Sequence, residues 1–96
     1  MKSNTAKYKE IIIPIITKHL PHTKIILYGS RARGTDKPGS DIDIALDTGA
    51  QIDDRVLSAI VYDLEESDLP ITFDLIDLHA VAKEMKHEVL KDGIIW

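Results

Sequence analysis

The sequence predicts a small α/β (α+β) domain, in which helices pack on a sheet of three or slightly more strands. Two observations support this fold class. Segments with apolar residues at helical spacing alternate with short β-branched runs, and turn-forming residues separate them. The 96 residues suit one domain, which we place at 1–96. The expected order is helix, strand, loop, strand, helix, strand and helix.

The first half of the chain begins with an amphipathic segment. A helix is expected over Thr5–His19, because apolar side chains recur there at helical spacing. Asn4 or Thr5 can cap its first turn, and Pro14 is expected to kink or split it. The β-branched run Lys24–Tyr28 then predicts a buried strand.

The middle of the chain is rich in turn residues. Residues 29–40 form a loop, in which a short helix can run from Ser30 through Arg33. Polar and apolar residues alternate over 41–46, which predicts a strand. Asp53 or Asp54 then opens a second long helix, whose apolar positions repeat at helical spacing.

The last third repeats the alternation of strand and helix. A third strand is expected over 71–76, directly after Pro70. A final helix is expected over 80–90 and should end at Gly93. The terminal residues 94–96 are apolar, so they either fold onto the core or dock into a partner.

Composition narrows the possible functions. The net charge is −4 and the isoelectric point about 5.4, which argues against direct binding of nucleic acid and against template-directed synthesis. Cysteine is absent, and no apolar run is long enough for a membrane span. We therefore expect a cytoplasmic protein with no membrane association, whose small core makes a partner subunit plausible.

The strongest chemical signal is a pair of acids in the second strand. Asp41 and Asp43 are two residues apart, so both side chains lie on one face of the strand. Adjacent carboxylates repel one another unless a cation lies between them. Oxygen ligands alone select Mg²⁺, or Mn²⁺, over zinc. The pattern predicts that both acids bind metal.

The third strand supplies another acid. Asp74 lies in an otherwise apolar strand, where an isolated buried carboxylate would be costly. If this strand lies beside the second, Asp74 joins Asp41 and Asp43. Three such carboxylates can hold two metal ions for an in-line displacement at phosphorus. Asp77 has the opposite parity, and we expect it to cap the following helix.

The loop before the acids suits phosphate binding. Gly29 permits close backbone approach to an anion, and Ser30 adds a hydroxyl donor. Arg31 and Arg33 offer positive charge for a triphosphate, although one of them can instead pair with an acid or a partner. The segment is not a P-loop, because Lys and Ser/Thr are missing after Gly34.

These residues together resemble a known superfamily. Gly29-Ser30, ten intervening residues and Asp41-x-Asp43, followed by Asp74, are similar to the motif of the DNA polymerase β-type nucleotidyltransferases. Over nearly its whole length the chain resembles their minimal nucleotidyltransferase (MNT) proteins. The resemblance implies a small nucleotidyltransferase fold with a mixed sheet. It also implies transfer of a nucleoside monophosphate from ATP or another NTP, with Mg²⁺ ions held by the three acids as catalytic residues.

The resemblance also implies a partner. Minimal members are typically encoded beside a helical HEPN protein, act as its antitoxin, and are thought to transfer AMP to one of its tyrosines. Two alternatives stay open: an antitoxin that blocks the toxin by contact alone, and a catalytic subunit for small molecules with a separate helical substrate-binding subunit.

The remaining polar residues give weaker signals. The acids between residues 63 and 68 form a solvated helix end or meet a partner's basic surface. The histidines form no ligand set, and we expect them at the surface; they are His19, His22, His79 and His87.

Overall fold

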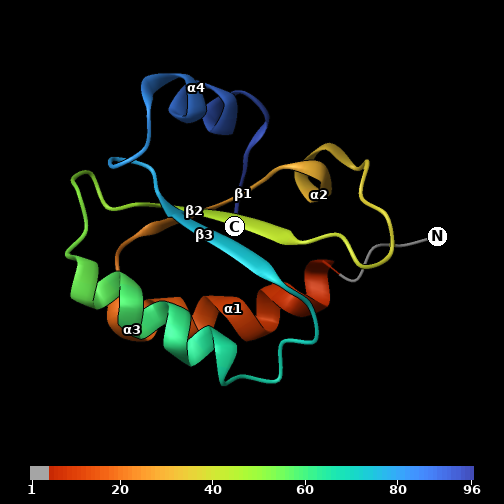
Figure 1. Cartoon of the computed structure of the whole chain (residues 1–96), viewed down its shortest axis with the longest axis horizontal. Coiled ribbons are helices and arrows are strands. Elements are labelled where there is room, and N and C mark those ends of the chain that lie inside the picture. Colours follow the sequence, from red (N-terminus) through yellow and green to blue (C-terminus); the bar gives the residue numbers. More distant parts are fainter. Residues whose placement is uncertain (1–4) are drawn as a thin grey trace.

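The computed structural model describes residues 5–96, and Asn4, one of the two expected helix caps, lies outside them. A four-stranded mixed sheet forms the centre, with strand order β3-β2-β1-β4 (Figure 1). β1 is antiparallel to β2 and β4, and β2 is parallel to β3. The elements are α1 (Thr5–His19), β1 (Lys24–Tyr28), α2 (Ser30–Arg33), β2 (Ile42–Asp47), α3 (Asp54–Glu65), β3 (Phe73–Asp77), α4 (Lys83–Asp92) and β4 (Ile94–Ile95).

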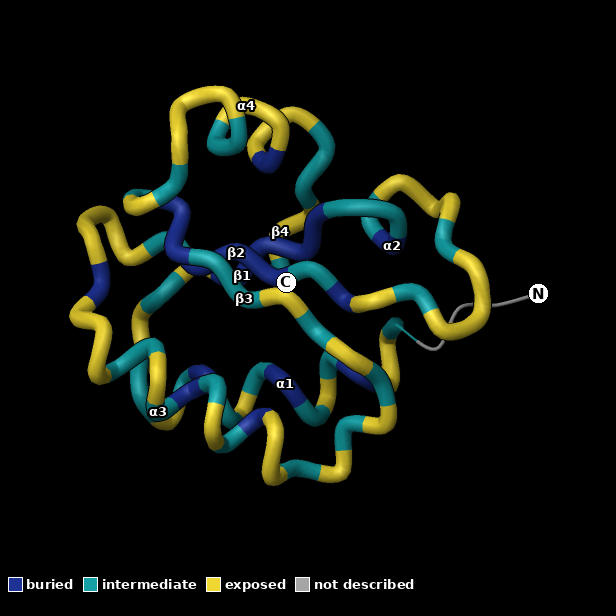
Figure 2. The backbone as a smooth tube through the Cα atoms, viewed as in Figure 1, coloured by how far each residue is buried: buried dark blue, intermediate teal, exposed yellow. Residues whose placement is uncertain are grey.

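Helices α1 and α3 cover one face of the sheet (Figure 1). Alternate residues of β1 and β2 point to this face and form the larger core with Ile12 and Ile16 of α1 and Ile60 of α3. These three helical residues are at most 1% exposed. In Figure 2 the dark blue of buried residues follows the central strands and the sheet-facing sides of both helices. Most of the apolar burial therefore lies on this side of the sheet.

The opposite face is only partly covered. Val89 of α4 and Leu78, which follows β3, pack there against Ile26, Tyr28 and Ala45 in a smaller core. In Figure 1, α4 stands above one part of the sheet, and α2 stands apart from it, beyond the end of β1. The polar ends of β1, β2 and β3 therefore stay accessible between them.

The fold class is confirmed, and several boundaries shift. Pro14 is exposed and lies within one unbroken helix, so of the kink or split expected there the split is wrong, and the kink stays a prediction. β3 begins at Phe73 and continues to Asp77, because its pairing follows β2 as far as Asp77 opposite Leu46. The last helix begins at Lys83 rather than at residue 80, since residues 78–82 form a turn after the strand.

The C-terminal residues resolve as a short strand. β4 pairs with β1, and the Trp96 amide donates to the Ile25 carbonyl at 2.8 Å. Trp96 also packs against the larger core, so of the two expectations for residues 94–96 the structure shows the first. Ile94 and Ile95 nevertheless remain 47% and 65% exposed. None of the helices in residues 5–96 combines the length and apolarity that a bilayer span requires.

Candidate active site

Three polar side chains lie in one row across the sheet. The register places Tyr28 of β1 opposite Asp43 of β2, and Asp43 opposite Asp74 of β3. Residues in register on adjacent strands point to the same face, here the one that α4 only partly covers. The Tyr28 hydroxyl donates to Asp74 Oδ2 at 3.1 Å. The sequence-predicted acids Asp43 and Asp74 therefore come from separate segments to neighbouring positions.

Asp41 lies just before this row. It precedes β2, is exposed, and accepts a hydrogen bond from the Thr72 hydroxyl. Thr72 precedes β3, and its carbonyl accepts from the Ile42 amide at 3.1 Å. The starts of β2 and β3 are thus joined by one backbone and one side-chain hydrogen bond. These bonds place Asp41 beside the start of β3.

Asp43 carries the clearest electrostatic signature. Burial, and then the charges of Asp74 and Asp41, raise the pKa of Asp43 above its ordinary value. The charges of Arg33 and Arg31 act on it in the opposite direction. Burial, together with the charge and hydrogen bond of Asp74, also raises the pKa of Tyr28, so this hydroxyl stays a donor. The site holds more negative charge than its own cations offset.

Gly29 connects β1 to α2 in a conformation that side chains disfavour. Its φ is 75° and its ψ is −157°, and an added Cβ would collide with Asp43 Oδ2. Its carbonyl accepts from the Ala32 and Arg33 amides, both at 3.2 Å, which starts the short helix. Ser30 is the first residue of α2, as the sequence suggested. The Gly-Ser turn therefore lies directly against a site carboxylate.

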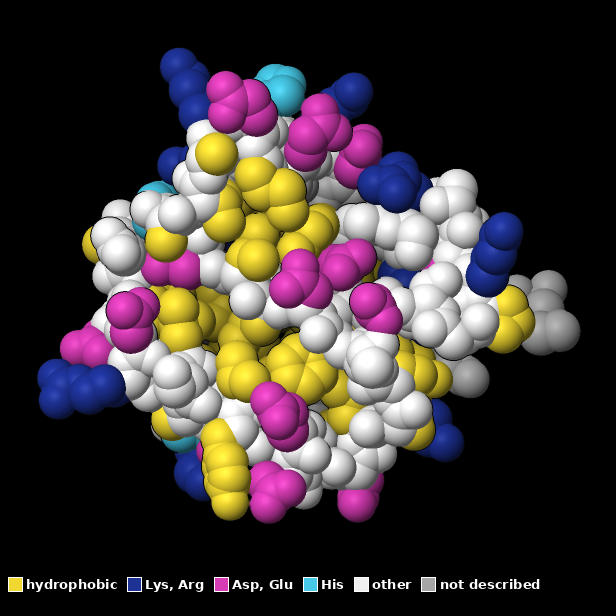
Figure 3. Space-filling model, in the orientation of Figure 1, with side chains coloured by type: hydrophobic (Ala, Val, Ile, Leu, Met, Phe, Trp, Pro, Cys, Tyr) yellow, Lys and Arg dark blue, Asp and Glu magenta, His cyan; other side chains and the backbone are white. Residues whose placement is uncertain are grey.

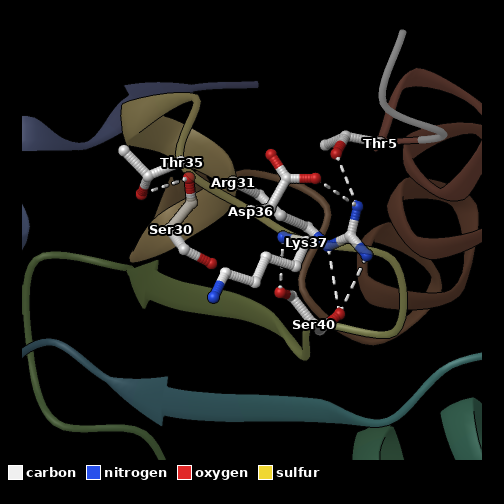
Figure 4. A network of polar contacts seen from close by, with 7 residues as sticks. All are labelled: Thr5, Ser30, Arg31, Thr35, Asp36, Lys37 and Ser40. Atoms are coloured by element: carbon white, nitrogen blue, oxygen red, sulfur yellow. Dashed lines mark hydrogen bonds and ion pairs between the residues drawn. The ribbon is translucent and has the colours of Figure 1, made fainter. Parts of the chain in front are cut away.

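Arg31 is held within the protein. Its guanidinium donates to the Ser40 carbonyl at 2.8 and 3.3 Å and to Thr5 Oγ1 at 3.1 Å, and pairs with Asp36 at 3.4 Å (Figure 4). It also lies 5.3 Å from the centre of the Tyr8 ring. Arg31 is only 9% exposed. In this structure it fastens the 34–40 loop to α1, and phosphate binding by Arg31 stays a prediction.

The other basic residues near the Gly-Ser turn extend away from the core. Arg33 and Lys37 are exposed. In Figure 4 the Lys37 and Ser30 side chains extend toward the same region above β2, while Arg31 points the opposite way, toward α1. The Lys37 amide is bonded to the Ser40 hydroxyl at 2.9 Å, which fixes the turn. Positive charge and a hydroxyl thus face the side on which the acids lie.

A hard cation fits the chemistry of the acids. Among residues 5–96, no group of three or more acidic or histidine side chains is drawn together closely enough to hold a metal ion. Asp41 is bonded to Thr72 and Asp74 to Tyr28, and carboxylates with no cation between them repel. Burial is the main cause of the raised pKa of Asp43, and the charges of Asp74 and Asp41 add to it; a divalent ion would offset these charges. Metal binding by these three acids stays a prediction.

Two residues at the site were not singled out for it from the sequence. Tyr28 ends the strand predicted to be buried, and its ring does pack in the smaller core, but its hydroxyl reaches Asp74. Thr72 lies two residues before Asp74, and this alternation is the signal in the sequence that places both on one face. Asp77, expected to cap a helix, instead accepts from the buried Ile52 amide at 2.7 Å and from the His79 amide at 3.0 Å. The observed cap position of α4 is Ala82.

A mixed sheet with a Gly-Ser turn after its first strand and acids on the next two is the architecture of a nucleotidyltransferase domain. The family model described as "Polymerase beta, Nucleotidyltransferase" matches residues 10–95, and the chain belongs to this family. None of the curated proteins compared with the chain matches it significantly.

Solved structures show the same fold. A chain from a crystal structure of a toxin–antitoxin with AMP-PNP is similar at 29% identity and a TM-score of 0.74, over 88% of this chain and 69% of that one. A chain from a mutant MntA–HpeT toxin–antitoxin is 27% identical with a TM-score of 0.74, over 99% and 72%. A third comes from a tri-AMPylated Shewanella oneidensis HEPN toxin in complex with MNT antitoxin, at 23% identity and a TM-score of 0.72, over 98% and 72%.

Proposed function

We propose that this protein is a metal-dependent nucleotidyltransferase that transfers AMP from ATP to a tyrosine of a helical HEPN-type toxin, and thereby acts as its antitoxin. The observation that carries the proposal is the row across the sheet, in which Asp43 and Asp74 lie in register with Asp41 nearby and Gly29 against Asp43. Membership of the nucleotidyltransferase family supports the reaction class.

The chain's residues have separate parts in the proposed reaction. The acceptor oxygen attacks the α-phosphorus of ATP, the bond from that phosphorus to the bridging oxygen breaks, and pyrophosphate leaves. Asp74 takes the proton of the acceptor hydroxyl. Gly29 and Ser30 hold the phosphates, and Arg33 adds positive charge beside them.

Asp41, Asp43 and Asp74 would hold Mg²⁺, which when bound supplies charge neutralisation at the phosphates. Tyr28 donates to Asp74 from the side of β1, which orients this carboxylate while leaving its other oxygen for the acceptor. The reaction needs positioning and neutralisation of charge more than covalent chemistry, which suits so small a site.

The solved relatives support the nucleotide and the partner. The one with 29% identity was crystallised with AMP-PNP, an ATP analogue, as a toxin–antitoxin. The one with 27% identity is likewise a toxin–antitoxin complex. We carry both properties to this chain as part of the proposal.

The test measures transfer of labelled nucleotide. The chain is purified with the helical protein encoded beside its gene and incubated with Mg²⁺ and α-phosphate-labelled ATP. We expect label on a tyrosine of the partner, and a loss of at least ~10²-fold in the Asp41→Asn/Asp43→Asn variant. The variant Asp54→Asn/Glu88→Gln removes two exposed acids elsewhere and should transfer normally.

Two results would contradict the proposal. A stable complex without transfer, equally protective with the Asp41→Asn/Asp43→Asn variant, would leave an antitoxin that acts by contact alone. Label on a small hydroxylated molecule instead of the partner would indicate a small-molecule nucleotidyltransferase.

A further inference from the structure

A groove runs between α3 and the edge strand β3. Its volume is about 560 Å³, and most of its lining residues are apolar, with polar groups among them. The lining includes Val61, Leu69, Ile71, Phe73, Thr72 and Asp74. Figure 3 looks onto this side of the molecule and shows apolar side chains exposed near its centre, with acidic side chains around them. The groove therefore combines apolar side chains with polar groups and lies within an acidic surface.

One end of the groove is the candidate active site. Asp74 lines the groove and also belongs to the row with Asp43. Thr72 lines it too, and donates to Asp41. A group lying in the groove would thus reach the carboxylate assigned to take the acceptor proton. The apolar lining suits the aliphatic or aromatic parts of side chains better than a sugar, whose hydroxyls would lack partners there.

The stretch of chain that forms the groove carries acidic side chains and no lysine or arginine. The stretch from residue 56 to residue 82 contains no lysine or arginine, although it makes up much of α3 and all of β3. It contains six acids, among them Glu65 of the groove lining and the exposed Glu66 and Asp68 next to it. In Figure 3 the Lys and Arg side chains lie mostly toward the outline of the molecule. The groove therefore favours a positively charged occupant.

The free edge of β3 carries backbone groups that can form further hydrogen bonds. β3 is the outer strand of the sheet, and no other strand of residues 5–96 pairs with its free edge. The Thr72 carbonyl and the Leu78 amide are bonded to β2. Alternation then turns the backbone groups of Phe73 and Leu75 outward. An extended segment can add to this edge by main-chain hydrogen bonds.

We propose that this groove binds the acceptor segment: an extended stretch of the partner protein in which lysine or arginine flanks the tyrosine. The inference rests on the proposed function and names its acceptor site. In such an added strand, alternation puts the tyrosine on the Asp74 face of β3, with its hydroxyl at Asp74, and its two neighbours on the groove side. Their aliphatic stems lie against Phe73 and Ile71, and their charges pair with Glu65 and Asp68. The phenolic oxygen forms the bond to the α-phosphorus of ATP, pyrophosphate leaves with the bridging oxygen, and Asp74 receives the phenolic proton.

The binding test uses a synthetic peptide, Gly-Lys-Arg-Tyr-Lys-Arg-Gly, titrated into the isotope-labelled full chain. We expect amide shifts confined to the second half of α3, to β3 and to the segment between them, residues 66–72. Affinity should fall about tenfold or more in Glu65→Lys/Asp68→Lys, because two attractions become repulsions. The matched variant Glu84→Lys/Glu88→Lys, on exposed positions of α4, should bind as the wild type does.

Several outcomes of the titration would overturn the groove as acceptor site. These are shifts elsewhere in the chain, no binding at millimolar peptide, an equal loss in the α4 variant, and equal affinity for a peptide with glutamate in place of the cations. Shifts of the groove amides on titration with ATP alone would also overturn it, since they would assign the groove to the nucleotide base.

A transfer assay separates this inference from the proposed function. With Mg²⁺ and labelled ATP, the peptide should be labelled by the wild type and at least tenfold more slowly by Glu65→Lys/Asp68→Lys. Equal labelling by both would refute the groove while leaving the transferase. A peptide that binds in the groove but receives no label, with the hydroxyl at Asp74, would refute the transfer and leave the groove as a docking site.

Discussion

Gly29 forms the backbone turn that lies against an acid of the candidate site. It combines a positive φ with close contact to Asp43, whereas Gly34 has the same φ of 75° and open space around it. We expect Gly29→Ala to lower the free energy of unfolding by about 1–3 kcal/mol, since it adds both strain and a collision. Gly34→Ala, the matched control, adds the strain alone.

Urea denaturation of the two glycine variants measures the difference. A larger loss in Gly29→Ala isolates the effect of contact with Asp43 from that of backbone strain. An equal loss in both would show that Asp43 moves aside freely, and would weaken the case for a tightly packed turn.

Asp43 should lower stability at neutral pH. Its pKa is raised in the folded state, so the folded protein holds this proton more tightly than the unfolded chain. The free energy of unfolding therefore falls as the pH rises from the unfolded value, about 3.8, through the raised folded value. Above that window Asp43→Asn should melt at a higher temperature than the wild type.

Thermal melts at pH 3 and pH 7, with chelator present, test this prediction. The advantage of Asp43→Asn should appear at pH 7 and shrink at pH 3. Asp54→Asn, on an exposed position, should show no such pH-dependent gain. A wild type as stable as Asp43→Asn at pH 7 would contradict it.

At the scale of elements, Asp77 joins two segments that are distant in sequence. From the end of β3 it accepts the buried amide of Ile52, just before α3, and the amide of His79. Asp77→Ala leaves the Ile52 donor without its partner, which should cost about 1–3 kcal/mol of unfolding free energy. Asp77→Asn keeps one acceptor oxygen and should recover part of the loss. Equal urea midpoints for wild type and Asp77→Ala would contradict this role.

The sequence predicted the elements whose signals are local. α1 is placed to the residue, and the alternation in β2 correctly set its acids apart from its buried isoleucines. The α4 boundary and the pairing of β4 depend on contacts between distant segments, which periodicity does not contain. Arg31 and Arg33 look alike in sequence, but two residues along a helix turn side chains to different sides. Only the fold shows that Arg31 faces α1.

At the scale of the whole molecule, charge is distributed unevenly. The stretch from residue 56 to residue 82 contains six acids and no lysine or arginine. The side of the molecule that it forms should therefore attract cationic segments over some distance. We expect the association rate of the basic peptide to fall at least ~10-fold when salt is raised to about 1 M, where the screening length is about 3 Å. Its dissociation rate should change less.

Stopped-flow fluorescence with a dye-labelled peptide measures both rates. An association rate that does not respond to salt would show that the acids of this side do not steer the encounter. The glutamate-substituted peptide, as a control, should associate faster with added salt, because screening removes a repulsion.

The two faces of β2 have a consequence for how this sequence tolerates change. Ile42 and Ile44 pack in the larger core beside α1 and α3, whereas Asp43 between them belongs to the row across the sheet. Substitutions that alter robustness and substitutions that alter chemistry should therefore alternate over these three consecutive residues. Apolar exchanges at the two isoleucines can drift and be compensated within the helices, whereas Asp43 has no apolar neighbour that could compensate for the loss of its charge. A mutational scan of β2 would then show stability lost at Ile42, activity lost at Asp43 and stability lost again at Ile44.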